Sequence, residues 1–145
     1  LGGVAAHVLC KLPRDAEGYM GRLRCVQEIS AVTAACMMVK TSVFKAVGGF
    51  DEELKVAFND IDLCMKVRKY GVKIVFTPYA ELYHYESKSR GMEDTPEKQL
   101  RFSREVNCFR RKWERELLKG DPYYNPNLTL NNTDCSLRKQ EKNGD

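Results

Sequence analysis

The chain has 145 residues, of which 43% are hydrophobic and 30% are charged, values typical of one soluble globular domain with a modest core. No apolar run approaches the length of a membrane-spanning helix, so a transmembrane segment is excluded. The net charge of +4 is mild, and no base-reading motif or aromatic platform accompanies the basic residues, so a nucleic-acid partner is not expected.

The first part of the chain predicts a loop followed by a buried strand. Residues 1–29 carry Pro13, Gly18 and Gly21 among mixed charges, which is typical of irregular structure. Residues 30–40 form a dense run of Ala, Val, Thr, Cys and Met, and this run predicts a buried strand. Its alanines allow another backbone segment or a sugar to approach closely, although packing is the more common use of such residues.

A short helix and an acidic loop are predicted next. Residues 41–47 carry an apolar stripe, and Thr41 can cap this helix through its hydroxyl. Gly48 and Gly49 end the helix, because glycine tolerates the left-handed backbone that follows a helix. Asp51 is the first of three carboxylates after them, and it can either cap the turn or face a ligand.

The second predicted helix starts at about Asn59. Leu63, Val67 and Tyr70 are spaced i, i+4, i+7 and form its expected buried face. Asn59 and Asp60 lie at its N-terminus, where free backbone N–H groups hold a side-chain oxygen in place. A carboxylate fixed there suits a general base, but an ordinary helix cap explains the same residues.

Asp62 is expected to point elsewhere. At 3.6 residues per turn it lies roughly 200° around the helix from Asp60. A structural contact is therefore predicted for Asp62.

Two short strands are predicted after this helix. Residues 72–77 are rich in β-branched side chains and end before Pro78. Residues 79–85 alternate, with tyrosines on one side and His84 on the other. A single histidine in a strand is more often structural than a metal ligand.

A long basic helix is predicted to follow. Asp94 or Thr95 before Pro96 is a clear start signal, and Gly120 marks the end. Between residues 97 and 119 lie eight basic residues against four glutamates. This face is predicted either to meet phosphates or anionic headgroups or to be solvated. The expected apolar contacts are Leu100, Val106, Phe109, Trp113 and Leu117.

The six cysteines lack any C-x-x-C pair, and this spacing argues against a zinc site. Cys36 and Cys64 lie in apolar runs and are predicted to be small core residues. Unpaired thiols are typical of the cytoplasm. We therefore expect a cytoplasmic location, with peripheral contact to the inner face of the membrane as a further expectation.

The C-terminal part predicts little regular structure. Residues 121–135 are rich in Pro and Asn and predict an extended segment. Residues 136–145 are short, polar and charged, and they predict a disordered tail.

Three segments of the chain, in this order, resemble one enzyme family. They are TAACMMVKTSVFKAVGGFDEEL, FNDIDLCMKVRKYG and IVFTPYAELYHYESKSRG. The chain is similar to the second half of a family 2 glycosyltransferase of the GT-A fold. The resemblance implies an α/β, Rossmann-like architecture, a mixed sheet with flanking helices, in which residues 1–135 form the acceptor-side half. Leu1 is not a natural start, so a nucleotide-binding half is expected before it.

The resemblance implies roles on the acceptor side. Asp60 fills the second position of the family's Glu-Asp pair, the position of the catalytic base. Asn59 stands where the glutamate would, so a second carboxylate is lost there. Asn59 and Asp51 are expected to contact the acceptor.

The resemblance also implies roles on the donor side. Thr33 and Ala34 are expected to wall the donor sugar pocket, and Arg90 to close over the diphosphate. His84 is expected to be one ligand of a Mg²⁺ or Mn²⁺ ion whose other ligand lies in the missing half. Asp60 and His84 are then expected to face one common hollow.

The expected function is metal-dependent, inverting transfer of a sugar from a nucleotide sugar to a glycan or lipid-linked acceptor, in bacterial cell-surface polysaccharide synthesis. The 145 residues alone are expected to be inactive and to hold no cation tightly. The alternatives are a non-catalytic module that binds an acceptor or a partner, and an adaptor that binds anionic surfaces. A dimer through the exposed cut face of the sheet is a further expectation.

Overall fold

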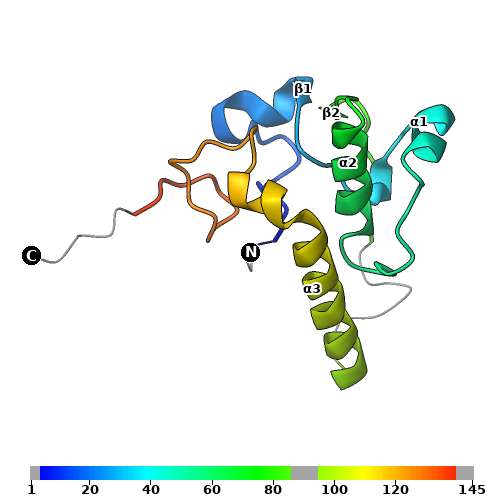
Figure 1. Ribbon diagram of the computed structural model, residues 1–145. Helices are drawn as coiled ribbons and strands as arrows, with labels where there is room; N and C mark the ends of the chain where they lie inside the picture. The colour runs from blue at the N-terminus through cyan, green and yellow to red at the C-terminus, as the bar shows by residue number, and fades with distance from the viewer. Residues whose placement is uncertain (1–3, 86–94, 140–145) are drawn as a thin grey trace, which may run out of the picture.

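A computed structural model describes residues 4–85 and 95–139 of the chain. Its 3-10 segments are Tyr19–Arg24 and Ala34–Cys36, and its strands are Gln27–Glu28 (β1) and Val75–Phe76 (β2). Its α-helices are Thr41–Ala46 (α1), Asn59–Lys69 (α2) and Pro96–Lys119 (α3). The first turns of α3 extend away from the other elements, and its last turns lie near the C-terminal segment (Figure 1).

The sheet of the described residues is a single antiparallel pair. Gln27 lies opposite Phe76 and Glu28 lies opposite Val75. Helices combined with a small sheet agree with the expected α/β class, but the mixed sheet expected from the resemblance is not present in residues 4–85 and 95–139. None of the helices in that part of the chain is long and apolar enough to cross a membrane.

The boundaries of α3 confirm the sequence prediction. The Thr95 hydroxyl accepts a hydrogen bond from the backbone N–H of Lys98, Pro96 is the first helical residue, and Gly120 ends the helix with a φ of 77°. The buried face differs in part from the expected one, because Leu100 is 54% exposed. The residues of α3 that are buried are Glu105, Phe109 and Trp113.

The two shorter helices form where predicted but are capped differently. Thr41 begins α1 without a side-chain cap, and Gly48 and Gly49 end it in left-handed conformations with φ of 78° and 63°. Phe58 precedes α2 with a φ of 64°, and no side chain caps that helix. The interpretation of Asn59 or Asp60 as the N-cap is therefore wrong.

Two predicted strands do not form. Residues 34–36 make an exposed 3-10 turn in place of part of a buried strand, because the Thr33 hydroxyl accepts from the Ala35 N–H and starts that turn. Residues 79–85 are exposed and irregular, with Tyr79 84% and Tyr83 85% accessible. β2 is paired with β1 over two residues only, so among the described residues there is no longer strand with which residues 79–85 could pair.

Two smaller predictions about burial are also wrong. Tyr70 is 58% exposed, since α2 ends at Lys69 and the chain turns at Gly71 with a φ of 92°. Cys36 lies in the exposed 3-10 turn, whereas Cys64 is buried as predicted. All six thiols are unpaired.

The hydrophobic core lies between α2, α3 and the loop before α2. Leu54, Phe109 and Trp113 form its buried centre. Half-buried side chains surround this centre, namely Val4, Phe58, Ile61, Met65, Cys108 and Leu117.

The C-terminal segment folds back on itself. Leu128 pairs with Leu137 across an isolated antiparallel bridge, and the Arg138 N–H donates to the Asn127 carbonyl. The backbone pairing thus continues into the segment 136–145 that was expected to be a disordered tail. Residues 140–145 lie outside the described part of the chain.

A buried carboxylate joins α2 to α3. The Asp62 side chain is fully buried, and its Oδ1 accepts from the Trp113 indole Nε1 at 2.8 Å. Lys112 Nζ lies 2.7 Å from Oδ1, and Lys66 Nζ lies 2.9 Å from Oδ2. The structural contact predicted for Asp62 is confirmed.

Asp62→Ala is expected to lower the free energy of unfolding by about 3 to 5 kcal/mol, because an indole N–H and two ammonium groups lose their buried partner. Asp62→Asn keeps an acceptor for the indole and should lose less. The measurement is urea unfolding followed by far-UV circular dichroism, with the exposed Glu52→Ala as control. Equal midpoints for Asp62→Ala and Glu52→Ala would contradict this role.

Candidate functional site

The predicted catalytic carboxylate lies against the predicted donor wall. Asp60 Oδ2 accepts a hydrogen bond from the Ala34 backbone N–H at 3.1 Å, although the two residues are 26 positions apart. Its Oδ1 accepts from the Ile61 N–H at 2.8 Å. The structure thus brings together Asp60 and the segment Thr33–Ala34, which sequence reasoning placed on two sides of one reaction.

A second contact one helical turn later fixes the same segment to α2. Cys64 Sγ lies 3.5 Å from the Val32 nitrogen and 3.6 Å from the Val32 oxygen. Asp60 and Cys64 are spaced i, i+4 and therefore share one face of α2. Burial raises the pKa of the Cys64 thiol, so this sulfur is a packing group and a weak hydrogen-bond partner rather than a nucleophile.

The geometry of Asp60 suits proton transfer. Its side chain is half-buried, and each oxygen accepts one backbone N–H, so the carboxylate is held in one orientation. A carboxylate has about four lone-pair sites, and the hydrogen bonds from the described part of the chain occupy two of them. A base must hold its oxygen toward the hydroxyl that it deprotonates, and a carboxylate anchored by backbone donors meets that requirement.

Asp51 makes the contacts of a structural turn residue. Its Oδ1 accepts from the Glu53 N–H at 3.0 Å, and its Oδ2 pairs with Lys112 of α3. The Lys112 ammonium holds the pKa of the Asp51 carboxyl below its ordinary value, and the Glu53 N–H acts in the same direction. Of the two roles considered for Asp51, the structure contains the turn contact, and acceptor binding stays a prediction. Asn59 is half-buried at the first position of α2.

The structure describes only one of the two residues predicted on the diphosphate and metal side. His84 lies in the exposed segment 79–85, and within residues 4–85 and 95–139 no hydrogen bond connects it to Asp60. Arg90 lies outside the described residues. In the described part of the chain no three side chains of His, Cys, Asp or Glu gather into a group that could hold a metal ion.

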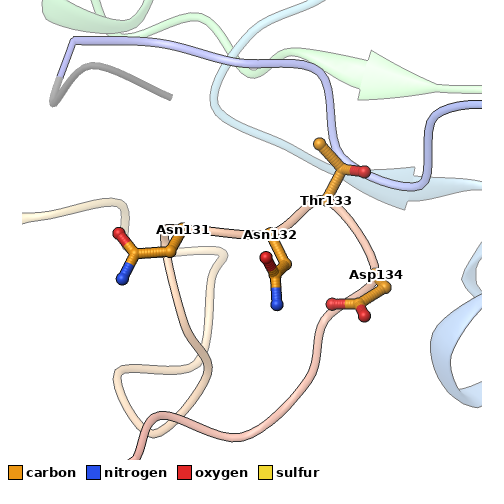
Figure 2. A pocket seen from close by; sticks show the side chains of 4 residues that line it. All are labelled: Asn131, Asn132, Thr133 and Asp134. Atoms are coloured by element: carbon orange, nitrogen blue, oxygen red, sulfur yellow. The ribbon is translucent and has the colours of Figure 1, made fainter.

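Two hollows occur elsewhere on the surface. One, of about 420 Å³, is lined by polar side chains of the C-terminal segment, and Figure 2 shows how they lie: Asn131, Asn132, Thr133 and Asp134. The other, of about 320 Å³, lies on α3 and is lined by Arg110, Arg111, Glu114 and Leu117. Among the described residues, neither Asp60 nor His84 lines these two hollows, so the common hollow expected for that pair stays a prediction.

Two residues next to the site, Cys64 and Glu105, are not among the site residues predicted from the sequence. Cys64 has a visible signal, since its i+4 spacing from Asp60 places both on one helical face. Glu105 has none, because a glutamate in a helix rich in basic residues is expected to be solvated. It is instead 3% exposed and contacts the loop before Asp60.

Comparisons with known proteins relate the chain to much longer polypeptides. It is 56% identical over 138 residues to the uncharacterised protein y4gI of Sinorhizobium fredii, covering 94% of this chain and 15% of that protein. It is 35% identical over 144 residues to the O-antigen biosynthesis protein RfbC of Myxococcus xanthus, covering 99% of this chain and 11% of that protein.

A third relative matches a shorter stretch. The chain is 36% identical over 62 residues to N-acetylglucosaminyl-diphospho-decaprenol L-rhamnosyltransferase of Mycobacterium tuberculosis, covering 43% of this chain and 20% of that protein. No family model and no solved structure matches the chain. The chain thus spans a fifth or less of these relatives, and in sequence it is glycosyltransferase-like.

Ala34→Pro is expected to displace the Asp60 carboxylate. Proline has no N–H, yet it fits the first position of a helical turn, and the ψ of 144° at Thr33 suits a following proline. The loss is expected to be about 1 kcal/mol in unfolding free energy, with faster amide hydrogen exchange over residues 30–36. Ala34→Ser keeps the N–H and serves as control. Equally slow exchange in the two variants would show that the contact is not made in solution.

Asp51→Asn is expected to reduce the loss of stability in acid. Because the folded pKa of Asp51 is lowered, its carboxylate stabilises the fold fully above the ordinary value of 3.8, and this contribution is lost as the pH falls through the folded pKa. Unfolding free energies at about pH 5 and about pH 3 should therefore differ less in Asp51→Asn than in the wild type. The control is Glu52→Gln at the neighbouring exposed position. An undiminished difference in Asp51→Asn would argue against the ion pair with Lys112.

Proposed function

We propose that this chain is the acceptor-side half of a family 2 glycosyltransferase of the GT-A fold. The reaction is transfer of a sugar, with inversion, from a nucleotide sugar to a glycan or lipid-linked acceptor. The observation that carries the proposal is the Asp60 carboxylate, held by the Ala34 N–H at 3.1 Å beside the segment that would wall the donor sugar. The named relatives in O-antigen biosynthesis and rhamnosyl transfer support a role in bacterial cell-surface polysaccharide synthesis.

In the proposed reaction Asp60 is the general base. Its carboxylate takes the proton of the acceptor hydroxyl, and the hydroxyl oxygen forms a bond to the anomeric carbon of the donor sugar. The bond from that carbon to the nucleoside diphosphate breaks, and the diphosphate leaves with the electron pair. Attack on the face opposite the leaving group inverts the configuration. Thr33 and Ala34 contribute the surface against which the sugar ring rests.

A divalent cation belongs to the proposal for the whole enzyme. When bound it would neutralise charge on the leaving diphosphate. His84 would be one of its ligands, and the family resemblance implies that the other comes from the nucleotide-binding half. A single imidazole cannot retain a metal ion, so we propose that residues 1–145 in isolation are inactive.

Asp60→Asn in the full-length protein is expected to lower kcat by a factor on the order of 10³, because the amide cannot accept the acceptor proton. Donor binding should be nearly unchanged. The measurements are nucleoside diphosphate release in vitro and restoration of surface polysaccharide in a strain that lacks the gene.

A control variant and two opposite outcomes make this experiment decisive. Asp134→Asn changes an exposed aspartate outside the proposed site and should retain wild-type turnover. Wild-type turnover in Asp60→Asn would end the assignment of the base. Restored polysaccharide in that variant without any turnover would favour a non-catalytic module that binds the acceptor or a partner protein.

A further inference from the structure

A buried glutamate of α3 holds the backbone just before Asp60. Glu105 is 3% exposed, and its Oε2 accepts a hydrogen bond of 2.7 Å from the Ala57 backbone N–H, 48 positions earlier in the chain. Hydrogen bonds to an ionised acceptor are roughly twice as strong as neutral ones. The contact therefore anchors the loop to the middle of α3.

The residue after Ala57 has a strained backbone. Phe58 has a φ of 64°, in the left-handed region, which costs a residue other than glycine on the order of 1 to 3 kcal/mol. Its ring packs against Phe109 and Phe102, with centroids 5.3 and 5.8 Å apart. The hydrogen bond of the preceding Ala57 and the packing of the Phe58 ring thus maintain a backbone conformation that the free chain would avoid.

This strained residue determines the direction in which α2 starts. The Phe58 carbonyl accepts the first hydrogen bond of the helix, from the Asp62 N–H at 2.8 Å. Asp60 follows Phe58 by two positions, so a change of the Phe58 dihedrals would swing its carboxylate away from the Ala34 N–H.

Glu105 is buried at a cost to stability. Its Oε1 accepts no hydrogen bond from the described residues and lies 3.8 Å from Nε of Arg101. An apolar side chain of the same length would leave no unsatisfied carboxylate oxygen, but it would take away the acceptor of the Ala57 N–H. A costly buried charge is expected where a group serves position more than packing.

We infer that Glu105 is a positioning residue for the Asp60 carboxylate. It fixes the Ala57 N–H, keeps Phe58 in its left-handed conformation and so sets where the first turn of α2 points. The inference rests on the proposed role of Asp60 as the base, whereas the anchoring of Ala57 can be measured without activity.

Two matched variants of the full-length protein test the inference. Glu105→Met and Glu105→Gln are both uncharged and similar in length, and only glutamine keeps an acceptor oxygen for Ala57. Amide hydrogen exchange of a peptide covering residues 55–61 is expected to be about tenfold faster in the methionine variant and near wild type in the glutamine variant. The kcat should fall on the order of 10- to 100-fold in Glu105→Met, with little change in the donor KM, and recover largely in Glu105→Gln.

Leu117→Ala is the stability control, because Leu117 packs on the same core and its apolar side chain cannot accept a hydrogen bond from the Ala57 N–H. An equal loss of kcat in Leu117→Ala would make the effect one of stability and overturn the positioning role. Slow exchange over residues 55–61 in Glu105→Met would overturn it as well. Full turnover in Asp60→Asn would instead overturn the proposed function, and the role of Glu105 toward a base with it, so the two failures are distinguishable.

Discussion

The buried carboxylate of Asp62 is the interaction on which the arrangement of α2 and α3 depends. It accepts a hydrogen bond from the Trp113 indole of α3 and forms ion pairs with Lys112 of α3 and with Lys66 of its own helix. Lys112 also forms an ion pair with Asp51, and Lys66 donates a hydrogen bond to the Gly49 carbonyl at 2.8 Å. The loop after α1 is therefore part of the same network. A charge removed from water needs all of these partners. The two helices therefore cannot slide or rotate without leaving that charge uncompensated.

The orientation of Asp60 follows from this constraint. Because Asp62 fixes the rotation of α2, Asp60 faces the opposite way, toward the segment Thr33–Ala34. Cys64 repeats the contact one turn later at Val32. The rotation of α2 fixed by Asp62 and the loop contact of Glu105 at Ala57 thus act together on the carboxylate, and proton transfer benefits from such rigidity.

The helices could be predicted from the sequence because their signals are local. Pro96 and Gly120 lie at the ends of α3, and the offset of Asp60 and Asp62 follows from helical periodicity alone. Strands need partners that a local pattern does not show. The apolar run at 30–40 therefore forms a 3-10 turn and irregular, partly buried chain, in which the Thr33 hydroxyl accepts from a nearby N–H. In the site, the family resemblance named Asp60 as the base and Ala34 as part of the donor wall, but it did not predict the hydrogen bond between them. Nothing in a basic helix indicated that Glu105 reaches a loop 48 positions away.

The offset of two residues between Asp60 and Asp62 limits how homologous chains can change in length here. One residue inserted between the two would turn Asp60 by about 100° relative to the anchored face, off the Ala34 side of the helix. An insertion at the exposed Glu52 or Glu53 would leave the angle between Asp60 and Asp62 unchanged, because the hydrogen bond from Ala57 to Glu105 fixes the chain after the insertion. Natural variation in length is therefore expected in that acidic loop, with an uninterrupted first turn of the helix behind it.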